Sequence, residues 1–222
     1  MAGRITPPDS WDSHVHCFNP TKHTFKPSRS YTPEAAPLSA LVASTYADCI
    51  TMFQASIEDG PRAARLEGVA RYGWSLSGQL SPRMWAALAD FLLHDEELRE
   101  VRIIADHNGS ATPEDASSPE FETFLGLLAA GRVSVKIGAL HRRAPDDIRR
   151  MQNVVEKLAA SGAGGIVWGS DWPHVDSTQT GETPSPPLPV NTAEELRVLK
   201  SWLSEDEWNG IFVVNPAKPF DA

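Results

Sequence analysis

The stretch Trp168-Gly169-Ser170-Asp171-Trp172-Pro173-His174, near the C-terminal end of the sequence, decides how the rest of the chain is interpreted. The apolar run 165–168 leads directly into it and predicts a short buried strand. A carboxylate at the end of such a strand is costly unless it is paired or used. An Asp beside Gly and Ser is also a common turn residue. By itself, the stretch therefore leaves a functional acid and a turn cap equally open.

The composition excludes several classes of protein. With 222 residues, 41% hydrophobic and 22% charged, the chain suits one soluble α/β domain over 1–222 with a sizeable core. A net charge of -9 without a dense Lys/Arg stretch argues against nucleic acid as a partner. No apolar run approaches the roughly 20 residues of a membrane span. Two cysteines and no apolar signal core predict a cytoplasmic protein, whose oligomeric state stays open.

Two histidines near the N-terminus raise the same question as Asp171. In segment 11–18, His14 and His16 stand two residues apart, which places both imidazoles on the same face of a strand. That geometry suits a metal ion or an anionic ligand. The alternative is a pair of exposed or hydrogen-bonded histidines with no ligand.

Short apolar segments alternate with helical patterns along the chain. The predicted strands are 11–18, 49–55, 69–76, 101–105, 133–138 and 165–168. Helices are predicted at 37–47, 62–67, 81–93, 121–130, 146–160, 192–203 and 204–212, the last two partly from caps at Thr192 and Ser204 and a capping box to Glu207. Residues 77–78 are expected in a loop. Apolar strands that alternate with helices imply a parallel sheet covered on both faces.

Polar side chains follow these strands at their carboxyl ends. They are His14 and His16, Gln54, Arg71, His107, Arg142 and Asp171. In parallel α/β folds, above all the (β/α)₈ barrel, this edge carries the chemistry. Six strands that deliver polar groups to one edge favour function over a turn cap at Asp171.

The same motifs resemble the amidohydrolase superfamily, specifically the amidohydrolase-2 branch that includes 2-pyrone-4,6-dicarboxylate lactonase. The matching segments cover nearly the whole chain in order: 12–16, 31–33, 53–55, 69–72, 105–109, 135–138 with Arg142, 168–174 and 214–217. The resemblance implies a TIM-barrel-like (β/α)₈ fold and a hydrolase of small cyclic esters, lactones or dicarboxylate-like molecules.

The resemblance also implies roles for the residues at the strand ends. Asp171 would be the general base toward water, with His14, His16 and His107 around the reacting carbonyl. The substrate, a small carboxylate or lactone, would be bound by Tyr31, Gln54, Arg71, Arg142 and His174. A carboxylate within reach of water is a competent base, and imidazolium or Arg donors stabilise an oxyanion and hold carboxylates.

The sequence departs from the family pattern in its length. At 222 residues it falls below the usual size of this barrel, about 250 residues. About six strands are recognisable, and the third and fifth of the family are missing, so we expect an incomplete or distorted barrel. Activity impaired by the missing strands is one consequence to test.

A metal is a separate question. The missing fifth strand is where metal-dependent relatives supply a further ligand, so the resemblance implies that no cofactor is required. If a divalent ion is bound, zinc or manganese held by His14, His16 and Asp171 is the alternative, because three protein ligands and a water suffice for catalytic zinc. Two other functions stay open: a metal-dependent decarboxylase of an aromatic-type acid, and an inactive remnant that binds a small anion.

Overall fold

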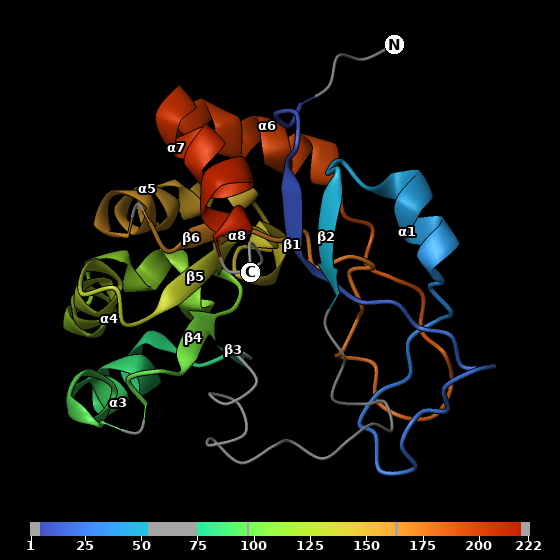
Figure 1. Cartoon of the computed structure of the whole chain (residues 1–222). Coiled ribbons are helices and arrows are strands. Elements are labelled where there is room, and N and C mark those ends of the chain that lie inside the picture. Colours follow the sequence, from blue (N-terminus) through green and yellow to red (C-terminus); the bar gives the residue numbers. More distant parts are fainter. Residues whose placement is uncertain (1–4, 53–74, 97, 163, 219–222) are drawn as a thin grey trace.

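Short parallel strands and covering helices make up the computed structural model, which describes residues 5–52, 75–96, 98–162 and 164–218 (Figure 1). The described strands are β1 (Trp11–Val15), β2 (Cys49–Met52), β3 (Ser75–Gly78), β4 (Arg102–Ala105), β5 (Ser134–Ile137) and β6 (Ile166–Trp168). The α-helices are α1 (Leu38–Ser44), α3 (Pro82–His94), α4 (Pro119–Ala129), α5 (Gln152–Ser161), α6 (Thr192–Trp202), α7 (Glu205–Asn209) and α8 (Asn215–Ala217).

The strands form an open, barrel-like arrangement. A four-stranded parallel sheet has the order β3-β4-β5-β6, and a second parallel sheet pairs β1 with β2. A parallel bridge between Val15 and Trp172 places β1 beside the end of β6. Within the described ranges no pairing joins β2 to β3, so the barrel is not closed there. This agrees with the incomplete barrel expected from the length of the chain.

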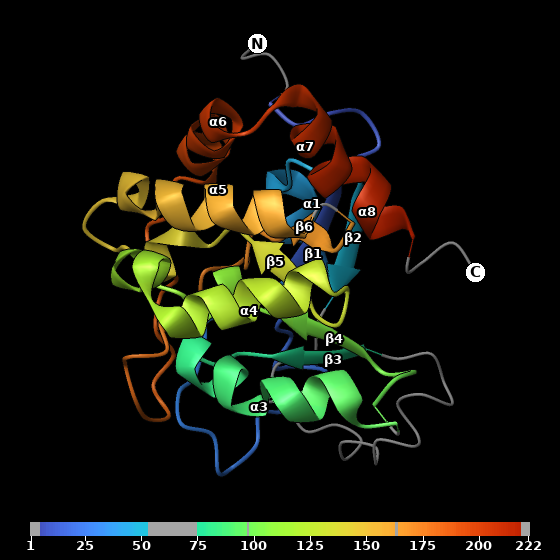
Figure 2. The same ribbon diagram turned by 90° about the vertical axis from the view of Figure 1, so that its left-hand side faces the viewer.

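The helices α3, α4 and α5 cover the outer face of the four-stranded sheet (Figure 2). The main core lies between this sheet and its helices, and it includes the fully buried side chains of Trp85, Phe124, Leu158 and Phe212. Local signals begin two of these helices: α3 starts at the predicted Ser81 cap, and α4 starts at Pro119, ahead of the predicted start at 121. The N-cap side chains of Ser81 and Ser118 each accept a hydrogen bond from the first turn, and a proline follows each cap.

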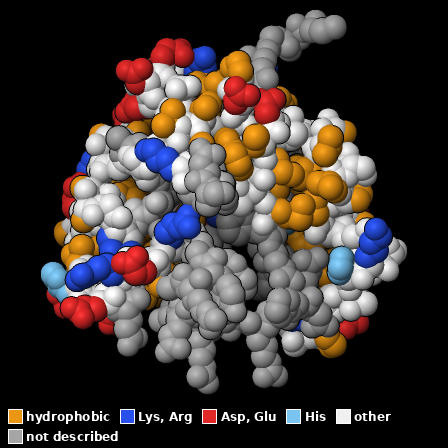
Figure 3. Space-filling view, in the orientation of Figure 1, with side chains coloured by type: hydrophobic (Ala, Val, Ile, Leu, Met, Phe, Trp, Pro, Cys, Tyr) orange, Lys and Arg blue, Asp and Glu red, His pale blue; other side chains and the backbone are white. Residues whose placement is uncertain are grey.

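The β1–β2 side of the molecule is packed much less completely. Its buried cluster consists of Phe18, Ala36 and Val175, with a few partly buried neighbours. On α1 and β2, Val42 is 66% exposed and Met52 is 50% exposed. Figure 3 shows hydrophobic side chains gathered on this part of the surface.

Three details of the predicted elements are wrong. Helix α6 is capped by the Asn191 side chain, because Thr192 is already helical. Ser77 and Gly78, expected in a loop, pair with β4 as part of β3. A 3₁₀ segment, Ile148–Met151, precedes α5 where a continuous α-helix was expected. The predicted helix 62–67 and most of the predicted strand 69–76 lie outside the described residues.

The capping box that links Ser204 and Glu207 is confirmed, and the chain after α7 continues as a π-helix, Gly210–Val214. Among the residues that the structure describes, no helix combines the length and hydrophobicity needed to span a membrane.

Candidate active site

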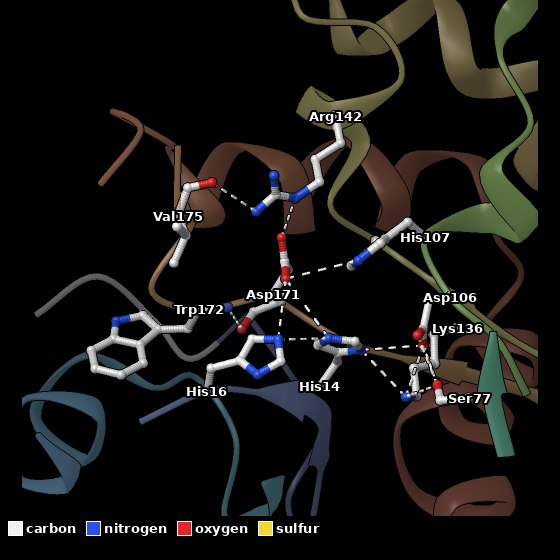
Figure 4. A network of polar contacts seen from close by, with 12 residues as sticks. His14, His16, Ser77, Asp106, His107, Lys136, Arg142, Asp171, Trp172 and Val175 are labelled. Atoms are coloured by element: carbon white, nitrogen blue, oxygen red, sulfur yellow. Dashed lines mark hydrogen bonds and ion pairs between the residues drawn. The ribbon is translucent and has the colours of Figure 1, made fainter. Parts of the chain in front are cut away.

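The side chain of Asp171 lies at the centre of a buried cluster of histidines (Figure 4). Its Oδ1 atom is 3.8 Å from His14 Nε2, 3.9 Å from His16 Nε2 and 3.9 Å from His107 Nε2. The other carboxylate oxygen, Oδ2, accepts a hydrogen bond from Nε of Arg142. The two oxygens of one carboxylate therefore have different environments, one facing three imidazoles and the other bound to a guanidinium.

These side chains come from the carboxyl ends of four different strands. His14 lies on β1 and His16 directly follows it; His107 follows β4, and Asp171 follows β6. Arg142 lies in a 3₁₀ turn after β5. The sequence predicted this convergence, because parallel strands of one barrel end at the same rim.

Backbone contacts fasten β1 to the segment after β6. The buried Asp12 carboxylate accepts hydrogen bonds from the backbone N–H groups of His14, at 3.2 Å, and Ser170, at 2.9 Å. The Asp171 N–H in turn donates to the carbonyl of His14 at 2.9 Å. Gly169 permits this close approach, since a Cβ there would lie 2.5 Å from the Cβ of His14. Segments 12–14 and 169–171, which are far apart in the sequence, thus form one edge of the site.

Two of the site residues have an uncommon backbone conformation. His107 has a φ of 49° and Asp171 a φ of 64°, both in the left-handed region that non-glycine residues rarely occupy. The buried Asn108 side chain fixes the turn after His107, because its amide donates to the Gly138 carbonyl at 2.8 Å. Such strained residues concentrate at functional sites.

A second buried group lies behind His14 and was not predicted as part of the site. Asp106 lies 2.9 Å from the ammonium of Lys136 and 2.7 Å from the hydroxyl of Ser77, and its Oδ1 is 3.3 Å from His14 Nδ1. The available sequence signal was a lysine inside the apolar strand 133–138 and an aspartate directly before His107. Both lie within the matching segments 105–109 and 135–138, but their side chains contact each other.

Burial and neighbouring charges set the ionisation of these groups. Burial lowers the pKa of His107 to about 4, so its imidazole is neutral at pH 7. Burial opposes ionisation of Asp171, but His107, Arg142, His14 and His16 outweigh it and lower the pKa of that carboxyl. Burial likewise raises the pKa of Asp12, to about 6. Asp171 is therefore an anion at neutral pH, as a base or a metal ligand must be.

The remaining predicted residues are placed differently. Tyr31 is half-buried and interacts electrostatically with Arg142 and Asp171; its burial raises the pKa of its phenol. His174 is buried, but its Nε2 lies 3.2 Å from the Thr192 hydroxyl and its ring packs against His141, away from the three histidines. Gln54 and Arg71 lie outside the described residues. Their predicted role in substrate binding stays a prediction.

The donor atoms at the centre suit a divalent metal ion. One ligand atom each from His14, His16 and Asp171 lies within 4.8 Å of the other two. The Nε2 atoms of the two histidines are 3.0 Å apart. Two imidazoles and a carboxylate form a donor set that zinc and manganese accept.

Fold and site together define a class of enzyme: a parallel α/β barrel with a histidine–carboxylate centre at the carboxyl ends of its strands. A sequence model of the family described as "Amidohydrolase" matches residues 54–221. The match covers most of the chain, and the chain therefore belongs to the amidohydrolase family.

Individual relatives are distant in sequence and close in fold. The 4-sulfomuconolactone hydrolase of Hydrogenophaga intermedia is 22% identical, and the alignment covers 97% of this chain and 90% of that protein. A probable 2-pyrone-4,6-dicarboxylic acid hydrolase of Acinetobacter baumannii, solved with citric acid bound, has a TM-score of 0.73 at 16% identity, over 96% of this chain and 100% of that one. A zinc-bound amidohydrolase of Burkholderia multivorans has a TM-score of 0.56 at 13% identity, over 96% and 99%.

The alignment also bears on the length of the chain. It extends over 278 residues, whereas this chain has 222. At least 56 aligned positions of the hydrolase, the difference between 278 and 222, thus have no counterpart here. The chain is a shortened member of its family, as the strand count predicted.

Proposed function

We propose that this protein hydrolyses a lactone or similar cyclic ester that carries a carboxylate or another small acidic group. The observation that carries the proposal is the different environment of the two carboxylate oxygens of Asp171. Arg142 donates a hydrogen bond to Oδ2, while Oδ1 faces the Nε2 atoms of three histidines. This arrangement supports a role for Oδ1 as the acceptor of a proton from a water bound beside it. It is the geometry that general-base hydrolysis requires.

Asp171 removes a proton from water as the water oxygen attacks the acyl carbon of the ring. Negative charge then develops on the carbonyl oxygen, where imidazole and guanidinium donors stabilise it. The ring C–O bond breaks, and the departing oxygen takes up a proton, so that one water is added and an open hydroxy acid is released. His107, neutral at pH 7, is suited to donate a hydrogen bond without adding a second buried charge.

A divalent metal gives a second form of the proposal, and the expectation that none is required stays a prediction that metal analysis tests. His14, His16 and Asp171 would hold it, and their nitrogen and oxygen atoms fit zinc or manganese. When bound, such an ion supplies a polarised carbonyl or a more acidic water. Manganese and zinc are distinguished by metal analysis of the purified protein.

The acidic substrate is supported by the chemistry of the site and by the relatives. Arg142 and Arg143 place positive charge beside the cluster, and guanidinium groups attract carboxylates. The relatives named above act on a sulfomuconolactone and, by description, on a pyrone dicarboxylic acid, and one of them holds citric acid. The cytoplasmic location and the absence of nucleic acid partners stay predictions from the sequence.

The test is turnover of a panel of acidic lactones by the wild-type protein and by Asp171→Asn. The amide keeps the shape of the side chain but cannot accept the proton of water, so we expect kcat/KM to fall by about 10³-fold or more. Asp90→Asn, on helix α3 where the carboxylate side chain is 97% exposed, is the matched control and should keep full activity.

Three results would contradict the proposal. Undiminished ring opening by Asp171→Asn would show that Asp171 is not the general base. Release of CO₂ from an aromatic acid, without ring opening of any lactone, identifies a decarboxylase instead. Binding of small anions without turnover of either substrate class identifies an inactive relative.

A further inference from the structure

The buried group behind His14 has no role in the hydrolysis described above. Asp106 is 8% exposed and Lys136 is 2% exposed. Lys136 Nζ lies 2.9 Å from Asp106 Oδ1 and 3.2 Å from the Ser77 hydroxyl, which is 2.7 Å from both carboxylate oxygens of Asp106. Three strands contribute one residue each, or the residue that directly follows, to this group. An ion pair so deeply buried is costly to assemble and contributes little stability for its own sake.

The imidazole of His14 bridges two carboxylates (Figure 4). Its Nδ1 atom is 3.3 Å from Asp106 Oδ1, and its Nε2 atom is 3.8 Å from Asp171 Oδ1. A neutral imidazole has one proton, so one ring nitrogen donates and the other offers a lone pair. The position of that proton decides whether the atom facing Asp171 and His16 can act as a ligand.

We propose that Asp106 is a positioning residue that accepts the Nδ1 proton of His14 and thereby turns the Nε2 lone pair toward Asp171 and His16. Lys136 and Ser77 hold the Asp106 carboxylate in place, and the ammonium compensates its charge. Carboxylates that orient a ligand histidine in this way commonly surround metal sites. The importance of this role for metal binding rests on the proposed function, but the position of the proton does not.

The contacts of Lys136 argue for this tautomer over the opposite one. Lys136 Nζ lies 3.3 Å from His14 Nδ1 and could donate to it, which would move the imidazole proton to Nε2. The ammonium has closer acceptors in Asp106 and Ser77. If Nδ1 had no proton, its lone pair would face a lone pair of the Asp106 oxygen, and the two would repel each other. A protonated Nδ1 instead donates a charge-assisted hydrogen bond to that oxygen.

The wild-type protein provides the first test. We would label the histidines with ¹⁵N and record long-range proton–nitrogen correlations of the metal-free protein at neutral pH, assigning His14 by comparison with His14→Gln. The expected result is a proton on Nδ1 of His14. A proton on Nε2 overturns the proposal, and this result needs no change at Asp106 or Lys136.

The second test removes the acceptor. Asp106→Asn can present an N–H to Nδ1, so we expect the Nδ1–H form of His14 to be lost and zinc affinity to fall by roughly 10- to 100-fold. Asp90→Asn is the control with an exposed carboxylate, and a thermal melt of each variant shows that it is folded. A folded Asp106→Asn with an unchanged His14 tautomer and unchanged zinc affinity overturns the proposal.

The two proposals fail in different ways. If no lactone is hydrolysed but His14 has the Nδ1 proton and loses it in Asp106→Asn, the function is wrong and the positioning role holds. If lactones are hydrolysed but the His14 proton lies on Nε2, the positioning role is wrong. If the wild-type protein binds no zinc, the tautomer measurement alone decides the positioning role.

Discussion

The two sides of the barrel differ in how they are held together. The β3–β6 sheet and its helices share a large core, in which Phe124, Leu158 and Phe212 are completely buried. The β1–β2 side has a small cluster around Phe18, and α1 exposes Val42 to solvent. Yet the candidate active site draws on both sides, since two of its histidines belong to the thinly packed one.

Strand β1 is therefore held in place by its contacts with the segment after β6 more than by its own core. The Val15–Trp172 bridge and the Asp12 carboxylate join β1 to the well-packed side. The close contact between Gly169 and His14 completes this set of contacts, which we call the joint. Changes at this joint should therefore affect the site more than the stability of the core.

Among the changes that compare the two sides, Gly169→Ala should have the largest effect. The added methyl group would lie 2.5 Å from the Cβ of His14, so β1 must move away from Asp171. Since a shift of about 1 Å at a site can cost 10²-fold in rate, we expect at least that loss in kcat/KM, measured on whichever lactone the wild-type protein opens, with weaker zinc binding.

Gly126→Ala on α4 is the matched control. A Cβ at Gly126 meets no atom within 4 Å, and alanine favours a helix over glycine by about 0.5–1 kcal/mol. We expect unchanged activity and equal or higher stability in urea unfolding. Equal activity losses in both variants would show that the joint at Gly169 has no special role.

The second comparison removes one buried phenylalanine from each side. Phe124 packs against Trp85 in the main core, and Phe124→Ala should cost about 3–5 kcal/mol of unfolding free energy. Phe18 has fewer buried neighbours, and the surrounding loops can collapse around a smaller side chain, so Phe18→Ala should cost about 2 kcal/mol. Urea unfolding of both variants measures the difference. A larger cost at Phe18 would reverse the ranking of the two sides.

The third effect concerns pH and His174, beside the joint. Burial lowers the pKa of His174 to about 4 from the ordinary value of 6.5, so the folded protein binds fewer protons than the unfolded chain between these values. The stability from a neutral His174 is thus present above pH 6.5 and is lost as the pH falls toward 4.

At pH 5 the loss from His174 amounts to about 2 kcal/mol. His174→Asn lacks this titration, and asparagine tolerates the left-handed backbone at this position, where φ is 63°. The decrease in unfolding free energy from pH 7.5 to pH 5 should be about 2 kcal/mol smaller in the variant. Identical decreases in both proteins would mean that His174 titrates normally in the fold.

Much of the fold followed from local signals. Helix α3 begins at the predicted Ser81 cap, and the short apolar runs became parallel strands; the Ser118 cap that begins α4 was not predicted. The convergence of His14, His107 and Asp171 followed from their common place at strand ends. The end of β3 could not be predicted from local signals, because Ser77 and Gly78 are weak strand formers and are held in the strand by pairing with β4.

The site was harder to predict wherever a role depends on a partner distant in sequence. Asp106 and Lys136 stand 30 residues apart, and only the register of β4 beside β5 brings them together. His174 belongs to the same motif as Asp171, but both residues have a left-handed backbone conformation, and the His174 ring contacts Thr192. Sequence spacing indicates which residues share a rim and leaves their orientation to backbone turns.

The bond between the Asp12 carboxylate and the Ser170 N–H joins residues 158 positions apart. During synthesis, the first histidines of the site emerge long before the aspartate they face. Contacts of such long range form late and slow the folding of a chain. Each newly made molecule thus acquires its histidine–carboxylate centre only when nearly the whole polypeptide is present, and a nascent or prematurely ended chain has no centre to act with.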